Sequence, residues 1–255
     1  MEVSAEARWL HDLDARRASS RVEIAGGLAL RHDTFWAAHD HNKLSVLAGD
    51  DGALLADLAE EHLAGLAHRR VELRSDSAAL VAGLEAAGYT REDTLLMTLA
   101  AQPARDGGDA VVVELDLGQR VAAAVDGWRA ELPDADPEVW QQLGGRAVTA
   151  TAVAQTTFLG VVADGRVVAR ADIFVHDGIA QVEEVMTDET HRGRGLATAL
   201  VLDGVARARA AGATTVLLVA DVDDWPRHLY ERLGFRDRAV LPILSRDVAP
   251  PTGSD

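Results

Sequence analysis

Cysteine is absent from the chain of 255 residues. Its absence excludes disulfide bonds, thiolate metal sites and a cysteine nucleophile, and it fits any cellular compartment. Lysine occurs once, at Lys43, far upstream of the glycine-rich segments, so no Walker phosphate loop with its GK[ST] ending is present. No run reaches the ~18–20 apolar residues of a membrane span, and the first residues lack the basic and apolar parts of a signal peptide. We therefore expect a cytoplasmic protein with no membrane partner.

Positive charge is also scarce. Lys and Arg number 25 against 41 Asp and Glu, giving a formal net charge of −16 at pH 7. This balance argues against a general nucleic-acid binder, whose affinity depends on cationic contacts with phosphate. It favours a cationic substrate such as an amine, although weakly, because soluble proteins are often acidic. With 48% hydrophobic residues, the chain has enough apolar material for one large core or two modest ones.

One segment, residues 185–197, carries the local positive charge of Arg192 and Arg194 in this acidic chain. An apolar strand ends in an Arg/Gly-rich turn, and a long apolar-faced helix follows at once. Glycines let the backbone approach a ligand closely, and the first turn of a helix offers unpaired N–H groups and a positive dipole end. We predict a site for a pyrophosphate or similar anion here. Its expected residues are Val185, Met186, Thr187, Arg192, Gly193, Arg194, Gly195, Leu196, Ala197 and Thr198.

The spacing of this turn separates two families of phosphate loop. A dinucleotide fingerprint GxGxxG matches only in part, because Thr198 stands where the third glycine belongs. Arg192-x-x-Gly195-x-Ala197 instead resembles the acyl-CoA pyrophosphate loop, Q/R-x-x-G-x-G/A, of the GCN5-related N-acetyltransferases (GNAT). Downstream, the segment 229–235 (LYERLGF) resembles the second GNAT signature, in which a tyrosine lies near the acetyl thioester. The two motifs occur in the family's order, and the resemblance covers about residues 110–247.

The elements around these motifs predict an α/β fold. Asp164-Gly165 is a hairpin signal between strands at 158–163 and 167–175, and a further turn leads into a strand at 180–187. A β-branched run at 215–220 predicts a parallel return strand after the long helix. Hairpins, a helix and a parallel return give a mixed, mostly antiparallel sheet flanked by helices. The resemblance implies that this fold is GNAT-like and tandem. Further elements expected in this half are a strand at 110–115 and helices at 118–131 and 137–143.

The first hundred residues resemble an eroded copy of the second half. Both halves close a helix with glycine and an aromatic residue before a final strand, at 94–99 and 240–244. In the first copy, 48–52 (AGDDG) replaces the loop, and Leu84 stands at the tyrosine position, so we expect no CoA site there. Coincidence among common α/β elements is the alternative. The predicted domains are a degenerate GNAT-like domain at 1–103, a linker at 104–109, a catalytic GNAT domain at 110–248 and a flexible tail at 249–255.

The resemblance implies an acyl-CoA-dependent N-acyltransferase that moves the acetyl group of acetyl-CoA directly to a primary amine, without a metal. It also implies that the strand before the loop diverges from its parallel neighbour, and that the pantetheine arm enters the gap beside Val185 and Thr187. Tyr230 is the candidate general acid for the leaving thiolate. Glu183 is the first candidate base and Glu184 the second, on opposite faces by strand alternation. A water chain to bulk solvent is an alternative base.

Several questions stay open at this stage. The acceptor is expected to be a small-molecule or peptide amine, not a nucleic acid, and the protein a monomer or homodimer. A CoA-binding regulatory or structural module without turnover is the alternative function, and a nucleotide-binding domain is a third. The segment 39–41 (HDH) has too few neighbouring ligands for a metal motif, and we expect it to form a solvated loop.

Overall fold

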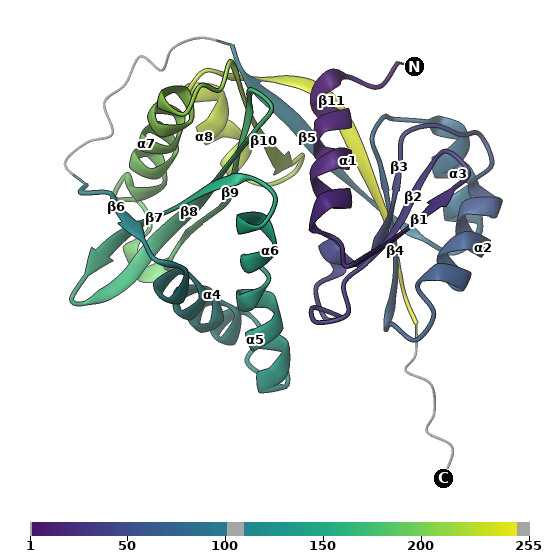
Figure 1. Ribbon diagram of the computed structural model, residues 1–255, viewed down its shortest axis with the longest axis horizontal. Coiled ribbons are helices and arrows are strands. Elements are labelled where there is room, and N and C mark those ends of the chain that lie inside the picture. The colour runs from purple at the N-terminus through teal and green to yellow at the C-terminus, as the bar shows by residue number, and fades with distance from the viewer. Residues whose placement is uncertain (1, 101–109, 249–255) are drawn as a thin grey trace. The chain divides into compact units, whose positions relative to one another are not determined.

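The computed structural model describes residues 2–100 and 110–248, which divide into two compact units (Figure 1). The first unit comprises Met1–Leu96 and Ala239–Asp255, and the second comprises Met97–Arg238. These boundaries differ from the predicted ones because two strands pass from one unit into the other. Strand β5 (Thr90–Leu99) begins in the first unit and ends in the second, whereas β11 (Phe235–Asp247) does the reverse. The predicted linker 104–109 and tail 249–255 lie outside the described residues.

The second unit carries a mixed, mostly antiparallel sheet, as predicted. Its strand order is β5-β10-β9-β8-β7-β6, in which β6 to β9 pair antiparallel and β9 pairs parallel with β10. The elements in chain order are β6 (Val113–Leu115), α4 (Leu117–Glu131), α5 (Pro137–Gly145), α6 (Val148–Thr151), β7 (Gln155–Ala163), β8 (Arg166–His176), β9 (Ile179–Thr187), the short 3-10 helix η2 (Glu189–His191), α7 (Leu196–Ala210), β10 (Thr215–Asp221) and α8 (Pro226–Arg232).

Two Asp-Gly turns set the register of this sheet. Asp164 and Gly165 join β7 to β8 with φ values of 50° and 76°, and Asp177 and Gly178 join β8 to β9 with φ values of 47° and 73°. Two consecutive residues with positive φ form the type I′ turn that matches the twist of a hairpin. The hairpin predicted from Asp164-Gly165 is therefore confirmed.

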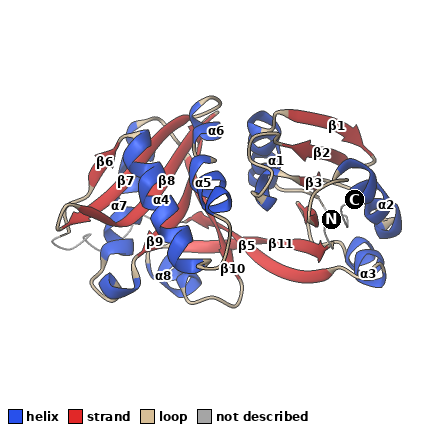
Figure 2. Ribbon diagram, turned by 90° about the horizontal axis from the view of Figure 1, so that it is seen from below, coloured by secondary structure: helices blue, strands red, loops and turns tan. Residues whose placement is uncertain are grey.

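Helices cover both faces of the sheet. Asp172 and Ile173 are neighbours in β8 and thus point to opposite faces. Asp172 accepts hydrogen bonds from Arg120 of α4, at 3.0 and 2.6 Å from Nε and Nη2 to Oδ2. Ile173 packs on α7 so closely that a Cβ added at Gly204 would lie 2.4 Å from its Cδ1. Figure 2 shows α4 lying in front of the strands. Arg120, Asp172 and Ile173 therefore fix the sheet between two helical layers.

The first unit repeats this order of elements. Three antiparallel strands are followed by a helix, a parallel strand, a second helix and a final strand, with sheet order β1-β2-β3-β4-β11-β5. The elements are α1 (Ala5–Arg17), β1 (Ser20–Ile24), β2 (Gly27–Arg31), the 3-10 helix η1 (His39–His41), β3 (Lys43–Val46), α2 (Gly52–His62), β4 (His68–Leu73), α3 (Ala78–Ala86) and β5. The structure thus supports the predicted internal repeat.

In each unit, one strand of the sheet comes from the other half of the sequence. In the first unit, β11 pairs antiparallel with β4, from Ile243 opposite Glu72 to Asp247 opposite His68. In the second unit, β5 lies beside β10. Both strands also extend beyond the predicted ranges 94–99 and 240–244. Among the described residues, no helix is long and apolar enough to cross a membrane.

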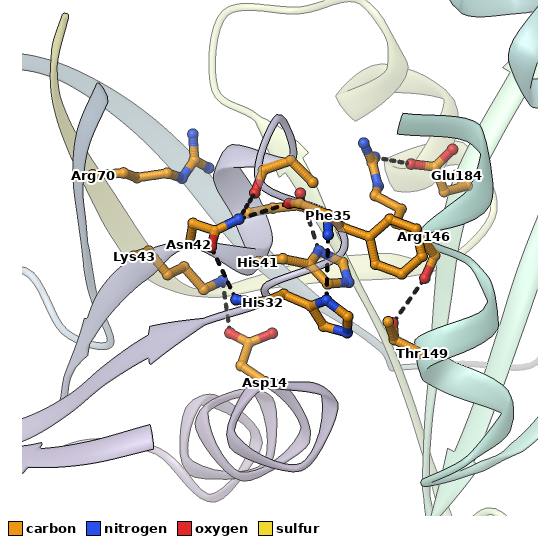
Figure 3. A network of polar contacts seen from close by, with 12 residues as sticks. Asp14, His32, Phe35, His41, Asn42, Lys43, Arg70, Arg146, Thr149 and Glu184 are labelled. Carbon is orange, nitrogen blue, oxygen red and sulfur yellow. Dashed lines mark hydrogen bonds and ion pairs between the residues drawn. The ribbon is translucent and has the colours of Figure 1, made fainter. Parts of the chain in front are cut away.

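The segment His39–His41 is a short 3-10 turn in which His39 is exposed and His41 is buried, so the predicted solvated loop is correct only in part. His41 is only 6% exposed, and the ring of His39 stacks on that of His68 at 3.7 Å. Asn42 closes the turn by donating from Nδ2 to the carbonyl of Phe35 at 2.7 Å (Figure 3). Burial lowers the pKa of His68 to about 4, which keeps its imidazole neutral. The described part of the chain contains no cluster of three or more His, Asp or Glu side chains able to hold a metal.

Candidate active site

The parallel strands β9 and β10 separate before they end. Their pairing runs from Ile179 opposite Thr215 to Gln181 opposite Leu217, while β9 continues to Thr187 and β10 to Asp221. A cavity of about 300 Å³ opens where the strands part. The divergence implied by the family resemblance is therefore present.

The cavity collects residues from five elements of the second unit and from the segment just after α5. Tyr230, Glu183, Glu184, Val185 and Met186 all lie in its wall, so the predicted catalytic residues come together with part of the predicted CoA site. The complete lining is Gly127, Trp128, Glu131, Arg146, Arg170, Val182, Glu183, Glu184, Val185, Met186, Val219, Ala220, Asp221, Pro226 and Tyr230.

A β-bulge interrupts β9 at the cavity. Met186 pairs with Arg170 and Glu183 with Asp172, so two residues of β9 oppose one residue of β8. Glu184 has a φ of 55°, a left-handed conformation that costs a residue with a Cβ about 1–2 kcal/mol. The bulge breaks the regular alternation on which our prediction relied. Glu183 and Glu184 consequently line the same cavity and not opposite faces.

Three arginines hold the carboxylate of Glu184. Arg146 donates from Nη2 to Oε1 at 2.6 Å, and Arg170 donates from Nη1 to Oε2 at 2.9 Å (Figure 3 shows the Arg146 contact). Arg120 Nη2 lies 3.2 Å from Oε2 and also pairs with Asp172. Burial raises the pKa of Asp172 and lowers the pKa of Arg170. The side chain of Glu184 is 17% exposed, and this network fixes its position at the cavity wall.

Tyr230 enters the cavity from α8. It is 7% exposed, and its ring packs edge-on against Phe235 with centroids 6.2 Å apart. Burial raises the pKa of the phenol to about 12, with a smaller contribution from the nearby carboxylate of Asp224. Desolvation penalises the phenolate, so the hydroxyl keeps its proton at neutral pH. At neutral pH Tyr230 therefore carries the proton that an acid needs and cannot act as a base.

The glycine-arginine loop precedes α7 with the geometry that its sequence predicts. Gly193 and Gly195 have φ values of 75° and 77°, and a Cβ at either position would meet no atom within 4 Å. Glycine is thus needed for its backbone conformation and not for space. Gly195 begins the helix without a side-chain cap, so the first turn presents its N–H groups. Arg192 and Arg194 are exposed. Arg192 donates to the main-chain carbonyl of Thr187 at 3.3 Å, and Arg194 donates to that of Thr190 at 3.1 Å.

The start of α2 in the first unit corresponds to the start of α7, but its first turn is capped by a carboxylate. Asp51 caps α2 with its own carboxylate, which accepts from the N–H of Leu54 at 2.9 Å. A Cβ added at Gly52 would lie 2.8 Å from Cα of Gly83, so α2 and α3 are in close contact there. A cavity of about 450 Å³ lies at the ends of β3 and β4, and Asp76 is the one charged residue among those that line it. No cationic side chain of the described residues lines this cavity, so it lacks the charge that would bind a phosphate.

Comparison with known proteins identifies the family. Residues 123–235 match the family model described as "Acetyltransferase (GNAT) family". The matched residues lie within the second unit, which therefore carries a GNAT acetyltransferase domain. A segment of 79 residues is 32% identical to the glucosamine 6-phosphate N-acetyltransferase of Trypanosoma brucei brucei, and this match covers 28% of the chain. It spans about half of that relative, 52% of its length.

Solved structures show the same fold over most of the chain. A GCN5-related N-acetyltransferase from Kribbella flavida superimposes with a TM-score of 0.61 and 22% identity, covering 98% of this chain and 97% of that one. A tandem GNAT protein from the clavulanic acid biosynthesis pathway gives a TM-score of 0.56 and 15% identity, covering 80% of this chain and 69% of that one. The GNAT fold, in a tandem form, is therefore shown.

The arginine network was missed in the sequence. Arg120 lies in α4, Arg146 just after α5 and Arg170 in β8, and nothing in their spacing links them to Glu184. One signal was present: Arg170 and Asp172 are charged residues inside the otherwise apolar run 167–175. Charges at such positions are rarely buried without partners. They indicated a buried ionic network beside the strand that carries the two glutamates.

Proposed function

We propose that the protein is an acyl-CoA-dependent N-acyltransferase that transfers acetyl from acetyl-CoA to a primary amine by direct attack. One observation carries this proposal. The cavity where β9 and β10 part contains the buried Tyr230, and β9 leads through η2 and the glycine-arginine loop into an uncapped helix N-terminus flanked by two arginines. A thioester with a long arm and a pyrophosphate fits this order of features.

The donor would be held by backbone groups and cations together. Residues 193–198 offer N–H groups and the positive end of the α7 dipole to the pyrophosphate, and Arg192 and Arg194 add formal charge. Beyond Gln181, β9 has no paired residue in β10, so the backbone at Val185 and Thr187 is available to the amides of the pantetheine arm. The hydroxyl of Thr187 is also buried without a hydrogen-bond partner in the described structure. Such an orphaned group is consistent with a ligand at this strand.

The reaction needs one proton removed and one supplied. The amine nitrogen attacks the thioester carbonyl carbon, the carbon–sulfur bond breaks, and the thiolate leaves. Tyr230 gives its phenolic proton to the sulfur, and Glu183 takes the proton of the attacking amine, directly or through water. Because the acetyl group moves directly from sulfur to nitrogen, the enzyme needs no nucleophile of its own.

The acceptor is an amine whose approach the carboxylates of Glu131, Glu183 and Asp221 favour, because all three line the cavity. The name of the curated relative, a glucosamine 6-phosphate N-acetyltransferase, supports an amine acceptor of small size. Peptide amines belong to the same chemical class. The first unit would bind no CoA, since its helix is self-capped and its cavity lacks a cation.

A thiol-release assay tests the proposal and separates it from a CoA-binding module without turnover. Acetyl-CoA is incubated with the protein and a panel of amines, including amino sugars, amino acids, polyamines and lysine peptides. The Tyr230→Phe variant serves as a control for background hydrolysis. Amine-dependent thiol release by the unaltered protein supports transfer. Tight acetyl-CoA binding with no release across the panel supports the module, and displacement of CoA by ATP or NAD would indicate a nucleotide-binding domain.

A further inference from the structure

We propose that Glu184 is a positioning residue that holds β9 in the shape the acyl donor requires; this inference rests on the proposed acyl transfer. Among the described residues other than glycine, three have positive φ. Asp164 and Asp177 are in hairpin turns, where such a conformation is usual, but Glu184 lies inside a strand. A left-handed residue inside a strand persists only where its surroundings hold it.

The bulge exposes backbone at the cavity. Val185 lies where the register of β9 against β8 shifts, between the pairs Glu183–Asp172 and Met186–Arg170. Pairing with β10 has already ended at Gln181. The bulge therefore places Val185 outside the regular pairing on both edges of β9, at the point where it lines the cavity. A regular strand would return Val185 to the ladder with β8.

The arginines tie the side chain of Glu184 to its own backbone. Arg170 Nη1 donates to Oε2 at 2.9 Å and also to the main-chain carbonyl of Glu184 at 3.2 Å. Arg146, just after α5, and Arg120 of α4 hold the same carboxylate. Because Oε1 and Oε2 both already accept from guanidinium groups, the carboxylate serves to hold the bulge. Glu183 remains the candidate for proton transfer.

Substitution by alanine and by glycine separates the two roles. Glu184→Ala and Glu184→Gly both remove the carboxylate, but only glycine adopts a φ of 55° without a steric penalty. If Glu184 acts by holding the bulge, Glu184→Gly binds acetyl-CoA about five-fold tighter than Glu184→Ala, or more. Both bind more weakly than the unaltered protein. Glu184→Gln, which keeps the length but lacks one acceptor oxygen and the charge, also weakens acetyl-CoA binding.

Isothermal titration calorimetry on the full chain gives these affinities, and hydrogen exchange over residues 182–187 reports the bulge itself. In the glycine variant we expect exchange closer to that of the unaltered protein than in the alanine variant. This second readout decides the matter if neither variant binds acetyl-CoA measurably. With an acceptor in hand, Glu184→Gln should lower kcat and leave the low-pH limb of the rate profile in place, whereas Glu183→Gln should flatten that limb.

Equal affinities and equal exchange in the alanine and glycine variants would overturn the inference, as would a Glu184→Gln variant that loses the low-pH limb. These results leave the proposed acyl transfer intact. If the unaltered protein fails to bind acetyl-CoA, the proposed function and this inference are both wrong. The two failures are therefore distinguishable in one set of titrations.

Discussion

Two glycines with the same backbone conformation allow a matched test of the glycine-arginine loop. Gly195 begins α7 with a φ of 77°, and Gly165 sits in the β7–β8 hairpin with a φ of 76°. At neither position would an added Cβ meet an atom within 4 Å. Gly195→Ala and Gly165→Ala therefore introduce the same strain, one inside the proposed CoA site and one outside it.

The size of the effect follows from that strain. A Cβ in the left-handed region costs about 1–2 kcal/mol, and no steric clash adds to it at either site. The stiffer unfolded chain of the alanine variant offsets about 0.4–1 kcal/mol, so the net cost is near 1 kcal/mol. For a protein of this size, that lowers Tm by about 2–4 °C. If the free loop of Gly195→Ala relieves the strain by changing conformation, acetyl-CoA binding must return the loop to its left-handed conformation. That cost of about 1 kcal/mol weakens acetyl-CoA binding about five-fold.

Differential scanning fluorimetry with and without acetyl-CoA, followed by calorimetry, measures both quantities. We expect Gly165→Ala to lose stability while keeping the CoA affinity of the unaltered protein. In Gly195→Ala the affinity should fall. Equal affinity losses in the two variants, or none in either, would refute the role of the loop conformation.

Further predictions concern the cations, the acid, the stoichiometry and the single lysine. Arg194→Glu should abolish most of the thermal shift produced by acetyl-CoA, whereas Arg21→Glu, an equal charge reversal at an exposed position in β1, should leave it nearly unchanged. Tyr230→Phe should lower kcat by ~10²-fold or more with little change in CoA affinity. Because the pKa of Tyr230 is raised to about 12, the phenol stays protonated at neutral pH, and its deprotonation should lower the rate of the unaltered protein only as pH rises toward that value. A Tyr230→Phe variant with near-normal kcat, measured while chemistry is rate-limiting, would remove the tyrosine from the mechanism. Calorimetry should give one CoA per chain, and two would contradict the self-capped first unit. Lys43 is 3% exposed and paired with two carboxylates, so an amine-reactive reagent should modify it only after unfolding, as peptide mass spectrometry would show.

Local chemistry explains what the sequence predicts well. Asp-Gly turns, the paired glycines before α7 and the proline that opens α8 each specify a backbone conformation through their own residues. The element order and the position of the anion loop follow from such signals. Tyr230 could be placed because the glycine that follows its helix fixes where that helix ends.

Non-local pairing explains what the sequence could not predict. The bulge at Glu184 depends on arginines from three distant segments, so strand alternation gave the wrong faces for Glu183 and Glu184. The exchange of β5 and β11 was missed for the same reason. A strand's own residues predict that it is a strand, but they do not say which neighbour it pairs with.

A crystal structure with acetyl-CoA bound tests the central claim most directly. We predict the pyrophosphate within hydrogen-bond distance of the main-chain N–H groups of 193–198, the pantetheine arm along β9 beside the bulge, and the thioester sulfur within reach of the Tyr230 hydroxyl. Acetyl-CoA bound elsewhere, for instance in the first unit's cavity at the ends of β3 and β4, or bound with its sulfur far from Tyr230, would contradict the account.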